Sequence, residues 1–166
     1  MDKGKRAISA LILFAILLLV ICAYYLIDYN SLHAVGSAFL NTHFNTSAIE
    51  IAYRANDIRG NAYLATSLQQ QYQGYMNSTT IGNCSGEGNC IGMLFVFKNQ
   101  SEECFWMKNT IIPLRQLWIS QNGIITYAYN ATPYSTKTIC ANGKYVLETQ
   151  LNIPIGANVS LPKNST

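Results

Sequence analysis

The residues with the clearest chemical potential lie in two short segments, 105–109 and 145–148. Trp106, Lys108 and Asn109 combine an aromatic surface with an ammonium group and an amide, which together could bind a carboxylate or a sugar hydroxyl. Glu148 could act as a general base or as a partner for Lys108. We therefore predict a ligand-facing edge made of these four residues. Two ordinary roles compete with it, a Lys108 stem lying on Trp106 and a strand-end ion pair at Glu148.

Several familiar catalytic sets are missing from the sequence. Both histidines, His33 and His43, precede the expected globular domain, which argues against Ser–His and Cys–His catalysis. There is no Gly-x-Ser-x-Gly motif and no phosphate-binding loop. We therefore predict a non-catalytic binding module. An enzyme that acts on envelope carbohydrate through Lys108 and Glu148 is the alternative, and no catalytic residue is assigned.

The cysteines indicate disulfides rather than a metal centre. Four cysteines lie outside the N-terminal apolar run, and an even number in an exported domain favours disulfides. Of the three possible pairings we favour Cys84–Cys90, which closes a Gly-rich loop, and Cys104–Cys140, which joins two strand ends. The sequence has no Cys-x-x-Cys spacing, so we predict no metal and no cofactor.

The N-terminus has the pattern of a membrane anchor. Residues 7–27 are an uninterrupted apolar run, and 21 residues in a helix span roughly 31 Å, enough to cross a bilayer. Lys3, Lys5 and Arg6 precede the run, whereas only Asp28 lies close behind it. The positive-inside rule then places residues 1–6 in the cytoplasm and the rest of the chain outside.

Three alternatives to a permanent anchor remain. A cleaved signal peptide would need a small-x-small exit, which Ile21-Cys22-Ala23 does not provide. Lipidation of Cys22 would need small residues before it. The segment Lys5–Ser9 also resembles the junction that archaeal prepilin peptidases cut. A pilin-like subunit with an apolar helix before a β-rich head is therefore a third functional hypothesis.

Glycosylation motifs and charge support an outside location. The sequence has 16 Asn and 24 Ser plus Thr, from which chance predicts roughly two Asn-x-Ser/Thr motifs, whereas seven occur. The net charge of the chain is +3, of which the first six residues carry +2, so the exported part is nearly neutral. A nucleic-acid partner is therefore not expected, and the partners we predict are the membrane and a cell-surface glycan or envelope protein. The candidate glycosylation sites are Asn45, Asn77, Asn83, Asn99, Asn130, Asn158 and Asn164.

Beyond the anchor, the pattern changes to strands. We expect a stalk over 28–47 and a β domain over 48–166, with hairpins turning at 56–60, at Asn122-Gly123 and at Asn142-Gly143. Ser67 has the position of a helix N-cap, with Gly74 ending a short helix over 67–73. The run 91–97 is continuously apolar, as in a strand buried on both faces. We expect a polar turn over 98–103 and a strand over 105–109.

Four blocks in this order resemble a widespread prokaryotic family called domain of unknown function 192. They are Ile-Gly-Met-Leu-Phe-Val-Phe at 91–97, Phe-Trp-Met-Lys-Asn-Thr-Ile-Ile-Pro-Leu at 105–114, Ala-Thr-Pro-Tyr-Ser at 131–135 and Tyr-Val-Leu-Glu at 145–148. The resemblance covers about 48–162 and implies a small domain without an established activity. The chain departs from the family pattern at Gln73, Arg115 and Ala157, where the family usually has Arg, Asp and Asp.

The predicted fold is therefore mainly β. We expect a compact antiparallel sandwich or roll with one short helix, preceded by one transmembrane helix. The predicted core residues are Leu94, Val96, Phe105, Leu117, Ile119, Val146 and Leu147.

Overall fold

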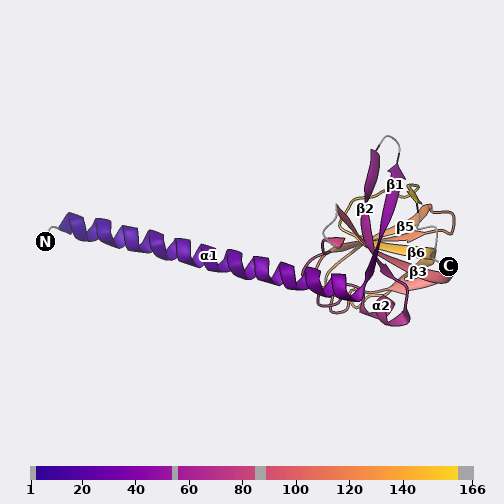
Figure 1. Ribbon diagram of the computed structural model, residues 1–166, viewed down its shortest axis with the longest axis horizontal. Helices are drawn as coiled ribbons and strands as arrows, with labels where there is room; N and C mark the ends of the chain where they lie inside the picture. Colours follow the sequence, from indigo (N-terminus) through magenta and orange to yellow (C-terminus); the bar gives the residue numbers. More distant parts are fainter. Residues whose placement is uncertain (1–2, 54–55, 85–88, 161–166) are drawn as a thin grey trace. The chain divides into compact units, whose positions relative to one another are not determined.

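The structure is a computed structural model that describes residues 3–53, 56–84 and 89–160. Helix α1 spans Lys3–His43, and helix α2 spans Leu68–Gln73. The chain forms two compact units, 1–35 and 36–166, and the second unit contains the sheet (Figure 1). The predicted stalk is helical up to His43, and the first strand begins at Asn45. The strands are β1 Asn45–Tyr53, β2 Asn56–Ala65, β3 Cys90–Phe105, β4 Leu114–Ile119, β5 Ile125–Ala131, β6 Ile139–Thr149 and β7 Asn158–Ser160.

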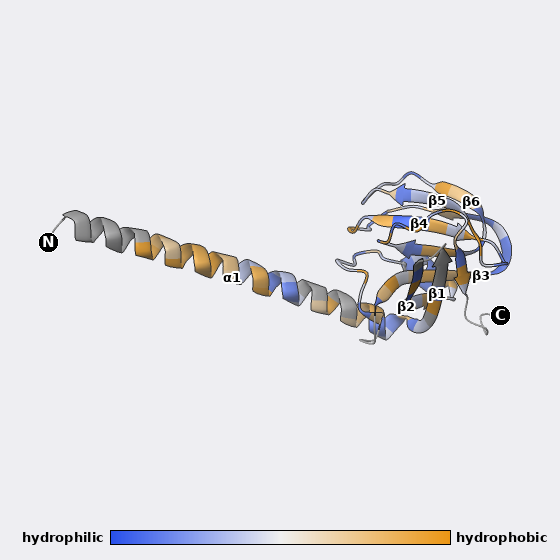
Figure 2. Cartoon of the chain, turned by 90° about the horizontal axis from the view of Figure 1, so that it is seen from above, coloured by the Kyte–Doolittle hydropathy of each residue, from blue (hydrophilic) through white to orange (hydrophobic). Residues whose placement is uncertain are grey.

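The first unit holds one candidate membrane span, over Ile12–Ser31. The side chains of this span are not covered by other parts of the chain. Figure 2 shows the apolar run along this part of α1. A hydrocarbon surface of this length is stable only when another apolar phase covers it. The segment therefore has the length and composition of a membrane anchor.

All seven strands belong to one curled sheet with the order β5-β4-β6-β3-β2-β1-β7. The mainly β, roll-like fold is confirmed, and the pairing of β2 with β3 is the parallel exception to the expected antiparallel pattern. The two edge strands approach each other at one end, where Ile124 bridges Asn158 and the Ile125 N–H donates to the Ala157 carbonyl at 3.0 Å. This contact closes one end of the roll.

The sheet is buried on both faces, which explains the continuous apolar run at 91–96. Alternate residues of β3 enter two separate clusters, with Met93 and Phe95 on one face and Leu94 and Val96 on the other. Six of the seven predicted core residues are buried, and Phe105 is half-buried. Glu148 lies on the face of Met93 and Phe95, since Met93 is its direct partner in the β3–β6 ladder.

The short helix has the predicted ends. Ser67 caps α2, its side chain accepting from the Gln70 N–H, while the Gln70 side chain accepts from the Ser67 N–H in return. The chain leaves α2 at Gly74, which has a φ of +44°. The left-handed region is accessible to glycine without a side-chain clash, so Gly74 allows the turn.

Four sequence predictions of local structure were partly or wholly wrong. Residues 56–60 belong to β2, and the connecting positions 54–55 lie outside the described residues. Asn142-Gly143 lies within β6, opposite Glu102 and Ser101. A Cβ at Gly143 would lie 2.9 Å from the Tyr145 carbonyl oxygen, so close packing rather than a turn explains this glycine.

The other two corrections concern β3. The predicted turn over 98–103 is strand, because β3 continues to Phe105 with only an irregularity in its pairing between Val96 and Ser101. The predicted strand over 105–109 is a turn after Phe105, where the Thr110 N–H donates to the Met107 carbonyl at 3.1 Å. The hairpin at Asn122-Gly123 is confirmed between β4 and β5, with Gly123 at a φ of +81°.

The two predicted disulfides are present. Cys84–Cys90 has a Cα separation of 5.2 Å, and Cys104–Cys140 has one of 4.1 Å. Cys104 and Cys140 are direct partners in the antiparallel ladder of β3 and β6. Their bond therefore cross-links the two strands that carry most of the candidate site.

The Tyr63 hydroxyl holds the loop before the first disulfide. It donates to Asn41 Oδ1 at 2.6 Å and accepts from the Cys84 N–H at 3.0 Å, and Tyr63 is fully buried. Tyr63→Phe would leave the Cys84 N–H without this acceptor, so we expect a loss of roughly 1–3 kcal/mol in the free energy of unfolding. Urea unfolding of the full chain in detergent, followed by tryptophan fluorescence, measures the change. Tyr134→Phe, at an exposed hydroxyl, is the control, and an equal loss in both variants would contradict the role of the Tyr63 hydroxyl.

Candidate functional site

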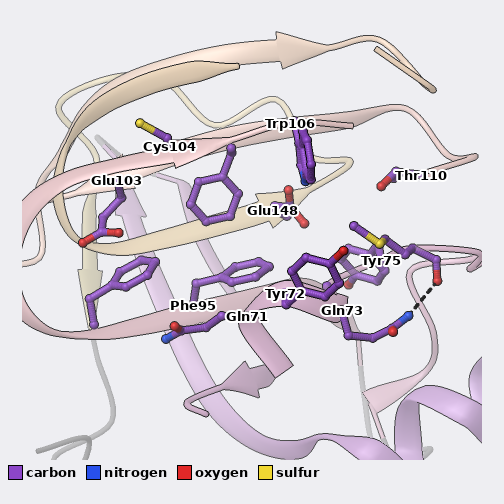
Figure 3. A pocket seen from close by; sticks show the side chains of 14 residues that line it. Gln71, Tyr72, Gln73, Tyr75, Phe95, Glu103, Cys104, Trp106, Thr110 and Glu148 are labelled. Carbon is purple, nitrogen blue, oxygen red and sulfur yellow. Dashed lines mark hydrogen bonds between the residues drawn. The ribbon is translucent and has the colours of Figure 1, made fainter. Parts of the chain in front are cut away.

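A cavity of about 200 Å³ lies on the face of the sheet that carries Glu148 (Figure 3). Its walls come from α2 and the turn that follows, from β3, from the loop after β3, and from β6. Of the lining residues within the described part of the chain, six are aromatic, two are glutamates, and none is Lys, Arg or His. The lining residues are Gln71, Tyr72, Gln73, Gly74, Tyr75, Met76, Phe95, Phe97, Glu103, Cys104, Phe105, Trp106, Thr110 and Glu148.

Glu148 is the most unusual residue of this cavity. Its side chain is almost completely buried, and its Oε1 accepts a hydrogen bond of 3.0 Å from Gln116 Nε2 on the adjacent strand β4. Among the described residues, no donor reaches Oε2, and no Lys or Arg forms an ion pair with the carboxylate. Figure 3 shows the carboxylate beside Trp106, directed into the cavity. One oxygen of a buried carboxylate is thus available to a bound group.

Burial changes the protonation of this site. Desolvation raises the pKa of Glu148 to about 7, and the Gln116 hydrogen bond offsets the effect only in part. Burial, followed by the nearby Glu148 carboxylate and Tyr63, also raises the pKa of Tyr75 well above its usual value of 10. Tyr75 therefore stays neutral, and its hydroxyl donates to the Ile81 carbonyl at 3.2 Å.

The aromatic walls are held by contacts with one another. Phe95 and Phe105 pack edge to face at 4.8 Å between ring centroids, and Phe105 packs in the same way on Phe97 and Trp118. The Trp118 Nε1–H donates to the Glu103 carbonyl at 2.9 Å. Each of these rings is held in place by contacts with neighbouring rings, so it does not have to collapse into the cavity to be packed.

Gly74 shapes the wall opposite Glu148. A Cβ at this position would lie 3.3 Å from Phe95 Cζ and 3.9 Å from Glu148 Oε2. The glycine that ends α2 therefore also lets the backbone approach the carboxylate closely. The helix is short, and its position against β3 is fixed by the Gln71 side chain, which donates to the Val96 carbonyl at 2.9 Å.

Two of the four sequence-predicted site residues line the cavity together, and two do not. Trp106 and Glu148 face the same space. Lys108 is exposed, with its Nζ 5.2 Å from the centroid of the Trp106 ring. Asn109 is exposed and adopts a φ of +57°, and its backbone carbonyl accepts from the Asn77 N–H at 2.7 Å.

Several site residues were missed at the level of the sequence. Gln116, Tyr75, Thr110 and Glu103 come from segments far from Glu148 along the chain. Gln116 is the one with a usable signal, because it precedes the apolar run Leu117–Ile119 of the same strand, and a buried glutamine requires a hydrogen-bond partner. Glu103 was assigned to a turn, whereas it lies on β3 and lines the same cavity as Glu148.

The predicted glycosylation sites that fall within the described residues all lie on the surface. Asn45, Asn77, Asn83, Asn99, Asn130 and Asn158 are exposed, and Asn164 lies outside the described residues. Among the described residues, Glu102, Cys104 and Cys140 form a close group of potential metal ligands, but both cysteines are in the disulfide.

The comparisons identify the family. The model of the domain-of-unknown-function 192 family, described as an uncharacterised ACR, matches residues 51–158. The chain therefore belongs to this uncharacterised family, as the sequence blocks indicated. No curated protein matches the chain.

Two solved structures share the fold. A candidate transcription regulator of Sinorhizobium meliloti has a TM-score of 0.63 and 25% identity, over 70% of this chain and 94% of that one. A protein of unknown function from Novosphingobium aromaticivorans has a TM-score of 0.61 and 23% identity, over 70% of this chain and 85% of that one. The second likeness shows the fold alone.

The raised pKa of Glu148 makes the stability of the protein depend on pH. The ordinary pKa is 4.5 and the folded pKa is about 7, so the folded state binds more protons between these values. Stability is then greatest below about pH 4.5 as far as this group is concerned, and falls as the pH rises through 7, by roughly 3 kcal/mol in all. We expect Glu148→Gln to remove this fall, measured by urea unfolding of the full chain at pH 5 and pH 8.

The exposed carboxylate of Glu102 provides the matched control. Glu102→Gln makes the same chemical change on β3 outside the cavity, and should keep the pH dependence of the wild type. A wild type whose free energy of unfolding does not fall between pH 5 and pH 8 relative to Glu148→Gln would contradict the burial of an unpaired carboxyl.

Proposed function

We propose that the chain is a membrane-tethered binding module whose domain lies outside the cytoplasm and takes a small ligand in the Glu148 cavity. The observation that carries the proposal is the buried carboxylate with one oxygen free to accept from a ligand. Among the described residues, no fully buried side-chain N or O atom lacks a hydrogen-bond partner, so Oε2 is accessible from the cavity, where a ligand can donate to it. The aromatic walls supply the apolar contact that small-ligand sites share.

The tether and the outside location have independent support. The span Ile12–Ser31 is long enough to cross a bilayer, and basic residues precede it. Tyr24, Tyr25 and Tyr29 gather near its C-terminal end, as tyrosines do at a membrane–water interface. Two disulfides and the exposed glycosylation motifs suit an oxidising compartment.

A binding role fits the cavity better than the enzyme that uses Lys108 and Glu148. Lys108 does not line the cavity, so it is not placed beside the carboxylate as a catalytic partner. One observation favours a different enzyme, because Glu103 and Glu148 line the same cavity and paired carboxylates are the usual set for glycoside hydrolysis. The Glu103 Oε1 atom already accepts a hydrogen bond from Ser101 Oγ at 2.6 Å. In the proposed module, Glu148 is therefore the carboxylate that binds the ligand.

The pilin-like alternative and the membrane anchor predict different N-termini for the mature chain. Mass spectrometry of the protein from its native host distinguishes the two. An intact apolar segment supports the anchor, whereas a chain that starts at Ile8 supports a processed, polymerising subunit.

The binding proposal is tested with the full chain in nanodiscs and a panel of envelope saccharides, amino sugars and small amines, by thermal shift and saturation-transfer NMR. We expect binders whose affinity falls roughly 10–100-fold in Glu148→Gln, because a charged hydrogen bond contributes about 1.5–3 kcal/mol. Trp106→Ala should weaken the same binders.

Lys137→Gln, an exposed residue away from the cavity, should bind as the wild type does. Binders that are unaffected by both cavity variants would contradict the site. Turnover of a saccharide by the wild type, lost in Glu148→Gln, would replace the binding role with the hydrolase.

A further inference from the structure

The charged residues that line the cavity in the described part of the chain are both acidic. They are Glu103 and Glu148, and no basic residue among the described ones lines the cavity. Lys108, whose Nζ lies 5.2 Å from the centroid of the Trp106 ring, does not line the cavity. An anionic ligand would meet two carboxylates without a counter-charge, so the cavity disfavours anions.

The aromatic walls also favour a cationic ligand. The faces of aromatic rings carry partial negative charge and attract cations, most strongly when the cation is removed from water. Six aromatic residues line the cavity, and the Lys108 ammonium at 5.2 Å shows that the Trp106 ring already accommodates a cation. A neutral ligand could satisfy Glu148 Oε2 by hydrogen bonding and pack against the rings, but it would gain no cation–π attraction from their faces.

The cavity is small, with a volume of about 200 Å³, and is partly open to solvent. A primary alkylammonium group with a short apolar stem fits this volume. Its ammonium can donate to Glu148 Oε2, and its stem can contact Phe95 and Phe105.

From these observations we propose that the ligand of the Glu148 cavity is a small organic cation, an alkylammonium group held by Glu148 and the aromatic walls. The group could belong to a free amine or to a lysine side chain of another protein, since both present the same chemistry. This inference rests on the proposed binding function and names its ligand class.

The test compares three probes of similar size on the full chain in nanodiscs at pH 8, by isothermal titration calorimetry and NMR. They are n-butylammonium, its neutral analogue 1-butanol, and the anion butyrate. We expect butylammonium to bind at least tenfold more tightly than butanol and butyrate not to bind. Nα-acetyl-lysine methylamide tests the lysine source, and it should bind only if the cavity admits a side chain attached to a peptide.

The pH dependence of binding has a fixed sign. A cation binds the ionised carboxylate, so the affinity for butylammonium should fall about tenfold or more between pH 8 and pH 5.5, as Glu148 is protonated around pH 7. The pKa of Glu148 should fall on binding, and protons should be released at pH 7. The other titratable groups that line the cavity with Glu148 are Glu103, Tyr72 and Tyr75, and the Lys108 Nζ lies 5.2 Å from the centroid of the Trp106 ring. Burial raises the pKa of Tyr75 well above its usual value of 10, so Tyr75 stays neutral over this range.

Variants separate the charge from the shape of the site. Glu148→Gln should remove the preference for butylammonium over butanol, whereas Glu102→Gln, outside the cavity, should keep it. The pH titration of the wild type tests the same point if Glu148→Gln fails to fold.

The outcomes distinguish this inference from the proposed function. Equal binding of butylammonium and butanol, or a preference for butyrate, would overturn the proposal that the ligand is a cation. A different result would be Glu148-dependent binding of a neutral saccharide and no binding of the ammonium probes. It would overturn the proposed cationic ligand but would still support the binding module. No Glu148-dependent ligand of any class overturns both.

Discussion

The antiparallel pairing of β3 with β6 fixes the position of Glu148 relative to the aromatic residues that β3 contributes to the candidate site. It runs from Gly92 opposite Thr149 to Phe105 opposite Ile139, and it places Glu148 beside Met93 in the middle of the sheet. Gly92 is required there, because a Cβ on it would lie 2.0 Å from the Glu148 carbonyl oxygen. At the other end of the ladder, Cys104 and Cys140 are bonded to each other. The same two strands therefore carry the carboxylate, the three phenylalanines of the aromatic walls and the cross-link.

Keeping Glu148 in this position opposes stability. Residues on both sides of it in β6 are apolar or fully hydrogen-bonded, as Thr149 is through its donation to the Ile91 carbonyl. A leucine or methionine in place of an unpaired buried carboxyl would ordinarily stabilise such a core. Gln116 supplies one hydrogen bond, and the second oxygen faces the cavity. A local conflict of this kind, in a domain that is otherwise consistent, is the physical reason to assign function here.

The sequence predicted the parts of the fold that depend on neighbouring residues. Ser67 and Gly74 mark the ends of α2 because capping is a local interaction, and Asn122-Gly123 forms a turn because the strands on both sides are adjacent in the chain. Asn142-Gly143 has the same dipeptide but lies in β6, since its partner strand is β3 and the pairing overrides the turn preference. The polar segment 98–103 is strand for the same reason.

The site could be predicted only in part, for the same physical reason. Trp106 and Glu148 were predicted as chemically unusual residues, and the structure brings them to one cavity. Lys108 and Asn109 were placed beside them by assuming that the strand continues to Asn109, whereas the chain turns after Phe105. Gln116, Tyr75 and Thr110 approach Glu148 only through the pairing of β4 with β6 and the packing of the turn after α2. Such contacts between distant segments have no signature in a single sequence.

The central claim, a buried carboxyl that lacks a counter-ion, is tested most directly by observing the titration of that carboxyl itself. The chain has five glutamates, and their side-chain carboxyl carbons can be labelled with ¹³C and followed by NMR from pH 3 to pH 9 in the full-length protein. We expect that one glutamate, assigned to position 148 by the loss of its signal in Glu148→Gln, titrates at about pH 7. Titration of Glu148 near its ordinary value of 4.5 would show that the group is solvated or paired, and would contradict the account.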